Sequence, residues 1–373
     1  MHLLMRRLNE CLTTSKNDKQ VKITVAIPCY NLEDRIGACL ESVISQDYKD
    51  FEIIVIDDCS TDDSVDVINE VINKHLERDI RLIINEMNLG LCKVRNIAID
   101  EAKGEFLFFV DGDDSIEQGT ISMFQHRMEQ THVDVVCGSF RKNDFNGNTY
   151  IIKQFPEDTL KGKFSFASYI EKYVNGYFNL GIWNNLYRLD FLKTHDIYCN
   201  TNYQIFEDRL FTFMVVMYAS GVSYINEVTY NYNDVPTSIC HQNNDNAFLP
   251  VYRAIITSVF DKINSIQTNS REQTLPYGIR FLRDYICMSD GLLGKCMKAE
   301  ASRCDKISLL KWLRNTLHNN DVNWSNIVGP YNRLSYLILI SPFPYQLFQI
   351  YFNHLKFVKK VFISLKLSNK SYD

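Results

Sequence analysis

The chain has 373 residues, of which 46% are hydrophobic and 23% are charged, and its formal net charge is −5. This length exceeds what one ordinary core encloses, so we expect two domains, or one large domain with an extension. The acidic balance gives no reason to expect nucleic acid as a partner, and eleven cysteines without a C-x-x-C pair or zinc spacing indicate a reducing compartment, the cytoplasm.

Residues 1–20 are predicted to form an N-terminal extension. They do not match a signal peptide, because their apolar stretches are short and Arg6 and Arg7 interrupt them. No uninterrupted apolar run in the chain reaches the ~20 residues that a membrane span needs.

Strand-like and helical patterns alternate from residue 21 onwards. Short apolar runs predict strands at residues 23–27, 51–56, 80–84, 106–110 and 133–137. These runs are apolar on both faces, and helical patterns separate the first four of them. Such strands indicate an α/β fold with a mostly parallel sheet that helices flank on both sides.

Apolar residues at helical spacing fill the intervals after the first three strands, in residues 32–46, 64–76 and 91–103. Ser60 and Asp63 have the spacing of a capping box for the second helix. Gly104 is expected to end the third helix in a left-handed conformation. The pattern is irregular and rich in Tyr, Phe and Asn from about residue 140 to 240, and it becomes helical again further on.

Polar residues follow four of the predicted strands. They occupy positions 28–31, 57–60, 88–90 together with Arg95 and Asn96, and 111–114. Ligands of parallel sheets bind beyond the carboxyl ends of the strands, so these residues are predicted to share one ligand-binding edge.

The last of these groups places three carboxylates, Asp111, Asp113 and Asp114, directly after a run of five apolar residues. Like charges at a strand end destabilise the fold unless something positive sits among them. Asp111 and Asp113 could hold a hard cation, Mg²⁺ or Mn²⁺, that also binds a nucleotide diphosphate. A turn of solvated acids is the alternative. A calcium loop is excluded, because Ile116 and Ser122 stand where that loop needs Gly and Glu.

Five phrases occur in consistent order over residues 21–240: AIPCYN, LESVISQDYKDFEIIVIDDCSTDDS, NLGLCKVRNIAIDEAKGEFLFFVDGDD, IWNNLYRLDFL and FEDRLF. In these phrases the chain resembles the inverting family-2 glycosyltransferases of the GT-A fold, of the type that builds bacterial surface polysaccharides. The resemblance implies a Rossmann-like GT-A domain with a nucleotide-sugar-binding half at 21–115 and an acceptor-binding half at 116–244. A helical region at 245–328 and a tail at 329–373 would follow.

The resemblance implies donor contacts at the strand ends. Asp57 would accept a hydrogen bond from a pyrimidine N–H, which favours a UDP-sugar, and Tyr30 would lie against the base or the pocket wall. The implied nucleotide-sugar-binding residues are Pro28, Tyr30, Asn31, Asp57, Asp58, Arg95, Asp111 and Gly112, and the implied metal ligands are Asp111 and Asp113. Plain packing for Tyr30, a helix cap for Asp58 and a surface ion pair for Arg95 remain alternatives.

The resemblance implies that Asp208 is the general base, because an acceptor hydroxyl loses its proton as it attacks the anomeric carbon. Glu207, Trp183 and Asn184 would lie in the acceptor or sugar pocket. An acidic first helical turn that complements the helix dipole is the alternative for the Glu207–Asp208 pair.

Two positions depart from the family pattern, which commonly has lysine at Asn185 and arginine at Asn233. Those basic residues would help to hold the diphosphate or the acceptor. His241 could complete a metal site, and a solvated loop histidine is the competing interpretation.

The segment 331–370 is basic in an otherwise acidic chain. Leu355, Val358, Phe362 and Leu365 share one helical face, and four lysines lie at its margin and beyond. Such a segment could contact an anionic membrane surface; a terminal helix packed on the protein is the alternative.

The sequence therefore predicts a hexosyl- or N-acetylhexosaminyltransferase. Its donor would be a nucleotide-sugar, and its acceptor a glycan or a lipid-linked oligosaccharide. It would work in the cytoplasm or at the inner face of the cell membrane. One rival is another nucleotide-diphosphate enzyme on a parallel sheet, such as a nucleotidyltransferase or a phosphohydrolase. A nucleotidyltransferase would need a glycine-rich, basic loop after the first strand, but no glycine follows that strand before Gly37. A phosphohydrolase would carry its paired aspartates after the first strand, whereas here they follow the fourth. The other rival is a degenerate transferase domain that serves as a scaffold.

Overall fold

The computed structural model describes residues 22–152, 181–201 and 207–234, and a few single positions between 253 and 316. The chain divides into two compact units: Met1–Phe166 with Tyr177–Pro236, and Ala167–Gly176 with Thr237–Asp373. The first unit contains every helix and strand named below. The predicted N-terminal extension lies outside the described residues, as do nearly all of the predicted helical region and tail, and these boundaries stay predictions.

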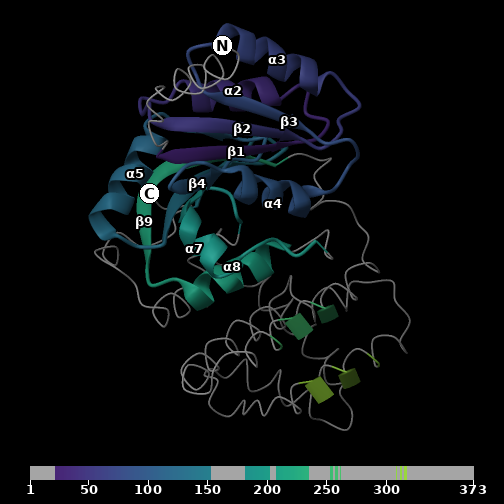
Figure 1. Ribbon diagram of the computed structural model, residues 1–373, viewed down its shortest axis with the longest axis vertical. Helices are drawn as coiled ribbons and strands as arrows, with labels where there is room; N and C mark the ends of the chain where they lie inside the picture. The colour runs from purple at the N-terminus through teal and green to yellow at the C-terminus, as the bar shows by residue number, and fades with distance from the viewer. Residues whose placement is uncertain are drawn as a thin grey trace, which may run out of the picture. The chain divides into compact units, whose positions relative to one another are not determined.

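The first unit is built on one sheet that helices flank on both sides (Figure 1). Within the described residues the sheet has nine strands in the order β3-β2-β1-β4-β8-β6-β9-β5, and β7 pairs with β6. The strands are β1 Ile23–Cys29, β2 Phe51–Asp57, β3 Ile80–Ile84, β4 Phe106–Phe109, β5 Ser115–Ile116, β6 Val135–Asn143, β7 Thr149–Ile152, β8 Asn185–Arg188 and β9 Val222–Asn233.

The first four strands are parallel, as predicted: β1 pairs with β2 and β4, and β2 pairs with β3. Beyond β4 the sheet is mixed. β8 is antiparallel to both β4 and β6, whereas β9 is parallel to β6. The predicted parallel sheet with flanking helices is therefore present, and antiparallel pairings are added only in its second half. A short hairpin joins β6 to β7, and so short a connection permits only antiparallel pairing.

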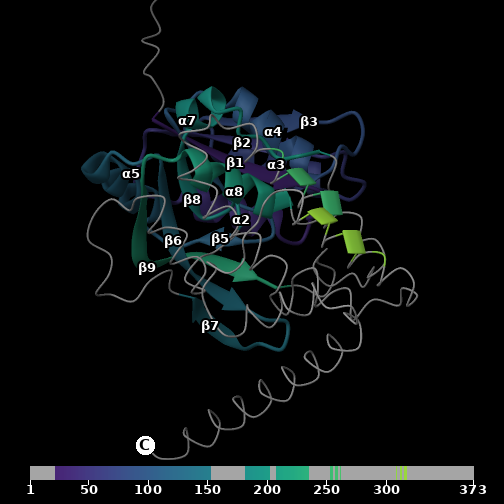
Figure 2. The same ribbon diagram turned by 90° about the horizontal axis from the view of Figure 1, so that it is seen from below.

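The helices are α2 Ile36–Ile44, α3 Ser64–Lys74, α4 Leu91–Glu101, α5 Thr120–Thr131, α7 Leu189–Thr194 and α8 Glu207–Tyr218. α2 and α3 cover one face of the β1–β3 region, and α4, α7 and α8 lie on the other (Figures 1 and 2). The chain steps from β1 to β2 to β3 and then returns to the far side of β1 as β4. The strand order therefore reverses between β1 and β4, and such a switch point is where open α/β sheets bind ligands. None of the helices in the described ranges combines the length and the hydropathy needed to span a bilayer.

Two predictions of helix ends were wrong. Asp63 is the N-cap of α3 but makes no side-chain capping bond, and its backbone N–H, which the capping box would pair with Ser60, donates to Glu33 at 2.9 Å. Gly104 lies outside the left-handed region, and Ala102 ends α4 in an extended conformation. Gly104 is required for a different reason: a Cβ atom there would lie 2.5 Å from the backbone nitrogen of Thr24.

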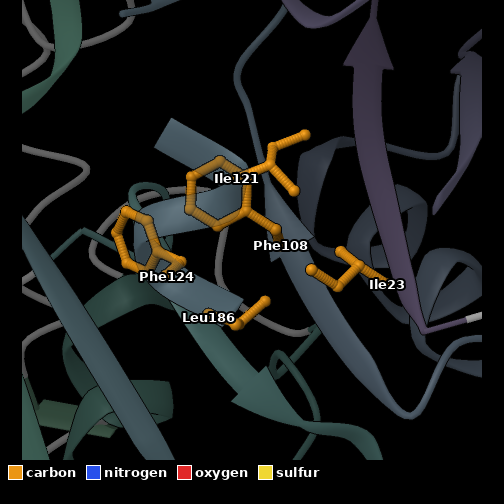
Figure 3. A pocket seen from close by; sticks show the side chains of 5 residues that line it. All are labelled: Ile23, Phe108, Ile121, Phe124 and Leu186. Atoms are coloured by element: carbon orange, nitrogen blue, oxygen red, sulfur yellow. The ribbon is translucent and has the colours of Figure 1, made fainter. Parts of the chain in front are cut away.

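The core between the sheet and α5 is closed by apolar side chains (Figure 3). Phe108 of β4 packs on Phe124 of α5 with ring centroids 5.0 Å apart. The gap that these rings share with Ile23, Ile121 and Leu186 has no room for a water molecule. This gap is a packing contact rather than a binding site.

Candidate active site

The loop after β4, residues 111–114, is called the acid loop below. It lies directly on the end of β1: a Cβ atom at Gly112 would lie 2.7 Å from the carbonyl oxygen of Pro28 and 2.8 Å from Leu32 Cδ1. Glycine therefore permits this approach. Pro28 is tolerated in a central strand because the register of β1 with β4 already ends at Ala26. The structure thus brings the predicted residues Pro28, Asp111 and Gly112 together at the switch point.

Part of the positive charge that the acid loop requires comes from α4. Arg95 Nη2 donates to Asp111 Oδ1 at 2.9 Å, and the two side chains are 4% and 21% exposed. The alternative of a surface ion pair is therefore excluded for Arg95. Asp111 keeps contact with solvent, so it can still bind a ligand while it is paired.

The third acid of the loop has a different environment. Asp114 is 3% exposed, and it accepts hydrogen bonds from the Tyr230 hydroxyl at 2.8 Å and from the backbone N–H of Asn233 at 2.7 Å. Burial, followed by the charges of Asp113 and Asp111, raises the pKa of Asp114 well above its ordinary value. Asp114 therefore belongs to the packing of the loop and does not face a ligand.

Asp113 is partly exposed, and burial together with the charge of Asp111 raises the pKa of Asp113 to about 6. Asp111 and Asp113 are hard oxygen donors of the kind that Mg²⁺ and Mn²⁺ prefer. Within the described residues no group of three or more His, Cys, Asp or Glu side chains is arranged to hold a metal. Two carboxylates still fit Mg²⁺, because this ion commonly binds one or two carboxylates and completes its shell with substrate phosphates and water.

The residues after β2 are held by local hydrogen bonds. Asp57 is completely buried, and its two carboxylate oxygens accept from the backbone N–H and the hydroxyl of Ser60. The same hydroxyl accepts from the backbone N–H of Asn31, so the ends of β1 and β2 are tied together. Asn31 is itself left-handed at φ 52°, and Tyr30 beside it is 46% exposed. The exposed Tyr30 ring has surface available for a ligand, whereas Asp57 has no exposed surface in this structure.

Asp58 fastens the loop that leads into α4. Its Oδ1 accepts from Leu89 N–H and from the Asn85 amide, both at 2.8 Å, and its Oδ2 accepts from Gly90 N–H at 2.7 Å. Gly90 has φ 85° and precedes the first residue of α4. The carboxylate of Asp58 therefore fixes the start of the helix that carries Arg95.

The segment before β8 lies beside the acid loop, because β8 runs antiparallel to β4 and Asn184 N–H donates to the Phe109 carbonyl at 3.2 Å. Trp183 is partly buried and stacks on Tyr230 and Tyr232, with centroids 4.7 and 5.4 Å apart. Trp183 and Asn184 are the two predicted pocket residues in this segment, and Trp183 is the one with exposed surface that a ligand could contact.

Asn184 is fully buried and left-handed at φ 58°. Its amide donates to the Gly138 carbonyl at 2.9 Å and accepts from the Thr229 hydroxyl at 2.8 Å. It therefore shapes the turn that presents Trp183. Asn185 is also buried, and it donates to the Gly181 carbonyl at 2.9 Å. Asn185, which stands where the family commonly has lysine, therefore places a hydrogen-bonding amide inside the turn.

Asn233, the second departure, reaches the acid loop. Besides its backbone bond to Asp114, its side-chain amide donates to the Asp113 carbonyl at 3.1 Å. A neutral donor therefore holds the loop at a position where the family commonly has a cation.

Asp208 lies in the first turn of α8 and is partly exposed. α8 packs on β8 through Phe211, whose ring meets Tyr187 edge-on at 5.7 Å. Asn96 of α4 ties down the chain ahead of α8: its amide donates to the Cys199 carbonyl at 2.9 Å and accepts from the Cys199 N–H at 2.8 Å. The side chain of Glu207 and His241 lie outside the described residues, so their predicted roles stay predictions.

Sequence reasoning missed Tyr230 as a residue of this site. Tyr230 is more than 110 positions from the loop it contacts, and no local pattern links the two. Asn96 was noted only as a polar neighbour of Arg95, and that adjacency on one helix was the available signal.

The acid pair thus lies at the switch point of an α/β sheet, the position where folds of this class bind their ligands. Residues 24–199 match the family described as glycosyl transferase family 2. This match covers just under half of the chain, and it agrees with the family resemblance of the sequence motifs.

The relatives and neighbouring structures agree with this assignment. EpsJ of Bacillus subtilis, described as an uncharacterized glycosyltransferase, is 27% identical over 58% of this chain and 62% of its own length. Poly(ribitol-phosphate) beta-N-acetylglucosaminyltransferase TarS of Staphylococcus aureus is 30% identical over 57% of this chain and 35% of its own length. This chain thus matches less than two thirds of either relative. The crystal structure of TarS 1-349 in complex with UDP-GlcNAc matches with a TM-score of 0.70 at 23% identity, over 90% of this chain and 92% of that one. This likeness confirms the GT-A fold.

Proposed function

We propose that this protein is an inverting glycosyltransferase that moves a sugar from a UDP-sugar to a glycan or lipid-linked acceptor. The observation that carries the proposal is the placement of Asp111 and Asp113, both partly exposed, at the switch point beside the buried Arg95. The name and the UDP-GlcNAc complex of TarS support a UDP-N-acetylhexosamine donor and a polymeric acceptor.

On this proposal, the residues of the β1 and β2 ends bind the nucleotide. Tyr30 would pack on the base through its exposed ring. Asp57 would accept the base N–H at an acceptor site that Ser60 leaves free, once a local movement exposes the buried carboxylate. Asp58 and Arg95 would support nucleotide binding indirectly: Asp58 fixes the start of α4, and Arg95 orients Asp111. Asp111 and Asp113 would hold Mg²⁺ or Mn²⁺, which when bound offsets the charge on the departing diphosphate.

Asp208 would take the proton of the acceptor hydroxyl. In that step the acceptor oxygen bonds to the anomeric carbon, the bond from that carbon to the diphosphate oxygen breaks, and UDP leaves with the electron pair. Trp183, held by the turn at Asn184, would form part of the wall of the sugar or acceptor pocket. Glu207 precedes the base on α8 and would lie in the same pocket.

Replacing Asp208 with asparagine tests the assignment of the base. Asp208→Asn should lower sugar transfer by roughly a hundredfold to ten-thousandfold and leave Mn²⁺-dependent UDP binding, measured by calorimetry, within about twofold. Asp190→Asn is the matched control, because Asp190 is also an acid in the first turn of a helix. If Asp208→Asn abolished UDP binding, the assigned role would be wrong.

A degenerate domain that only binds a partner is the second candidate, because Asn185 and Asn233 replace basic residues of the family pattern. Measuring UDP release from a panel of UDP-sugars with Mn²⁺ separates the two, since a scaffold would release none. We further propose that the protein works in the cytoplasm at the membrane, where lipid-linked acceptors are presented. The segment 331–370 that would make this contact lies outside the described residues.

A further inference from the structure

We infer that Tyr230 is a positioning residue for the donor site: its hydroxyl sets the conformation of the acid loop that binds the metal and the nucleotide diphosphate. The inference rests on the proposed function and adds to it a residue on β9, a strand remote in sequence from the donor-binding half.

The hydroxyl of Tyr230 makes two hydrogen bonds at once, and their directions are fixed by chemistry. The backbone N–H of Asp111 can only donate, so the phenol oxygen accepts from it, at 3.0 Å. The phenol proton then goes to Asp114 Oδ2, which lies 2.8 Å away. One oxygen therefore spans the acid loop from its first residue to its last.

A second tie comes from the same strand three residues later. Asn233 donates its backbone N–H to Asp114 Oδ1 at 2.7 Å and its amide to the Asp113 carbonyl at 3.1 Å. Together the two β9 residues bond to Asp111, Asp113 and Asp114, so a loop with three like charges has one defined shape.

The ring of Tyr230 contacts a second part of the site, the segment before β8. Trp183 stacks on it with a centroid separation of 4.7 Å and an interplanar angle of 23°. Tyr230 is completely buried, whereas Trp183 keeps some exposed surface. The ring of Tyr230 therefore supports the proposed sugar pocket, while its hydroxyl supports the metal loop.

Tyr230→Phe separates these two contributions, because phenylalanine keeps the ring and its stacking on Trp183 and loses only the oxygen. The Asp111 N–H and the Asp114 carboxylate then lose a partner, and the loop can adopt other shapes. We expect Mn²⁺-dependent UDP binding to weaken roughly five- to tenfold and the donor KM to rise by the same factor. The acceptor KM should stay unchanged.

Tyr198→Phe is the matched control. Its hydroxyl also donates to an aspartate, Asp100, at 2.8 Å, on the side of α4 away from the acid loop. This variant removes the same chemical group from a carboxylate, and UDP binding should stay within about twofold of the wild type. Asp114→Asn is the second variant. It removes the charge that accepts from both the Tyr230 hydroxyl and the Asn233 N–H, so it should weaken UDP binding at least as much as Tyr230→Phe. The double variant should lose less than the sum of the two single losses, because both substitutions affect the Tyr230–Asp114 bond.

The outcomes distinguish this inference from the proposed function. If the wild type binds no UDP in the presence of Mn²⁺, the proposed function is wrong. If the wild type binds and Tyr230→Phe binds equally well, the inference is overturned while the proposed function stands. It is also overturned if Tyr198→Phe weakens binding as much as Tyr230→Phe, or if the donor and acceptor KM values rise together, since either result would show a general loss of packing.

Discussion

The pair formed by Arg95 and Asp111 allows a test of whether the acid loop binds a cation. Arg95→Met keeps much of the side-chain volume and removes a positive charge that lies 2.9 Å from a carboxylate oxygen. If Asp111 is a metal ligand, arginine and the metal compete for the same negative charge. Removing the arginine should therefore weaken the fold and strengthen metal binding.

The two effects can be given magnitudes from the geometry. A hydrogen bond to a charged group contributes about 1.5–3 kcal/mol, and breaking a fully buried ion pair costs about 3–5 kcal/mol. Arg95 is almost fully buried, but Asp111 is 21% exposed and can be hydrated when its partner is lost. We therefore expect the variant to lose about 2 kcal/mol of unfolding free energy, a decrease in Tm of about 4–8 °C for a unit of this size.

Calorimetry or electron paramagnetic resonance with Mn²⁺ alone, at fixed ionic strength, measures the second effect. The Kd of the folded variant should fall by about fivefold or more, because loss of one nearby unit of positive charge is worth about 1 kcal/mol or more at this range. Arg188→Met is the matched control: Arg188 pairs with Glu105 at 3.0 Å near the start of β4, away from the acid loop. Unchanged Mn²⁺ binding in a folded Arg95→Met variant would refute the role of Asp111 as a metal ligand, whereas weaker binding would show that the orientation of Asp111 by Arg95 outweighs the competing charge.

Two further substitutions test the connections of the site. Asn96→Ala removes both hydrogen bonds to Cys199 and should lower kcat about tenfold while leaving the UDP Kd unchanged, because it releases the segment that leads to Asp208; an unchanged kcat would contradict this role. Gly112→Ala places a Cβ atom 2.7 Å from the Pro28 carbonyl and should abolish Mn²⁺-dependent UDP binding while the far-UV circular dichroism spectrum is retained; normal UDP binding would show that the loop can move away from β1 without consequence.

The first half of the fold could be predicted because its signals are local. β1 to β4 are short apolar runs with helical patterns between them, and periodicity alone identifies them. The second half depends on pairing between distant segments. β8 inserts between β4 and β6, whose residues pair with it from some 50 to 80 positions away, and a sequence pattern does not specify such partners. Their antiparallel direction was therefore not foreseen.

The candidate site shows the same division. Strand ends identified Asp57, Asp111 and Gly112, because topology brings the carboxyl ends of parallel strands to one edge. Sequence could not distinguish Trp183, which keeps exposed surface, from Asn184, which is fully buried. That difference depends on the left-handed turn at Asn184 and on its hydrogen bonds to β6 and β9.

The acid loop also explains why three adjacent carboxylates do not prevent folding. Asp111 is neutralised by the guanidinium of Arg95, and Asp114 is buried among neutral donors, Tyr230 and Asn233, which stabilise its negative form in part. Asp113 has neither a paired guanidinium nor a full set of hydrogen-bond donors, and its pKa is raised to about 6. Of the two carboxyls whose pKa is raised, Asp113 is the partly exposed one, so it can meet a ligand beside Asp111. A divalent cation bound by Asp111 and Asp113 would reduce the repulsion between these two carboxylates, and the ion's remaining coordination positions could take phosphate oxygens, as the proposed function requires.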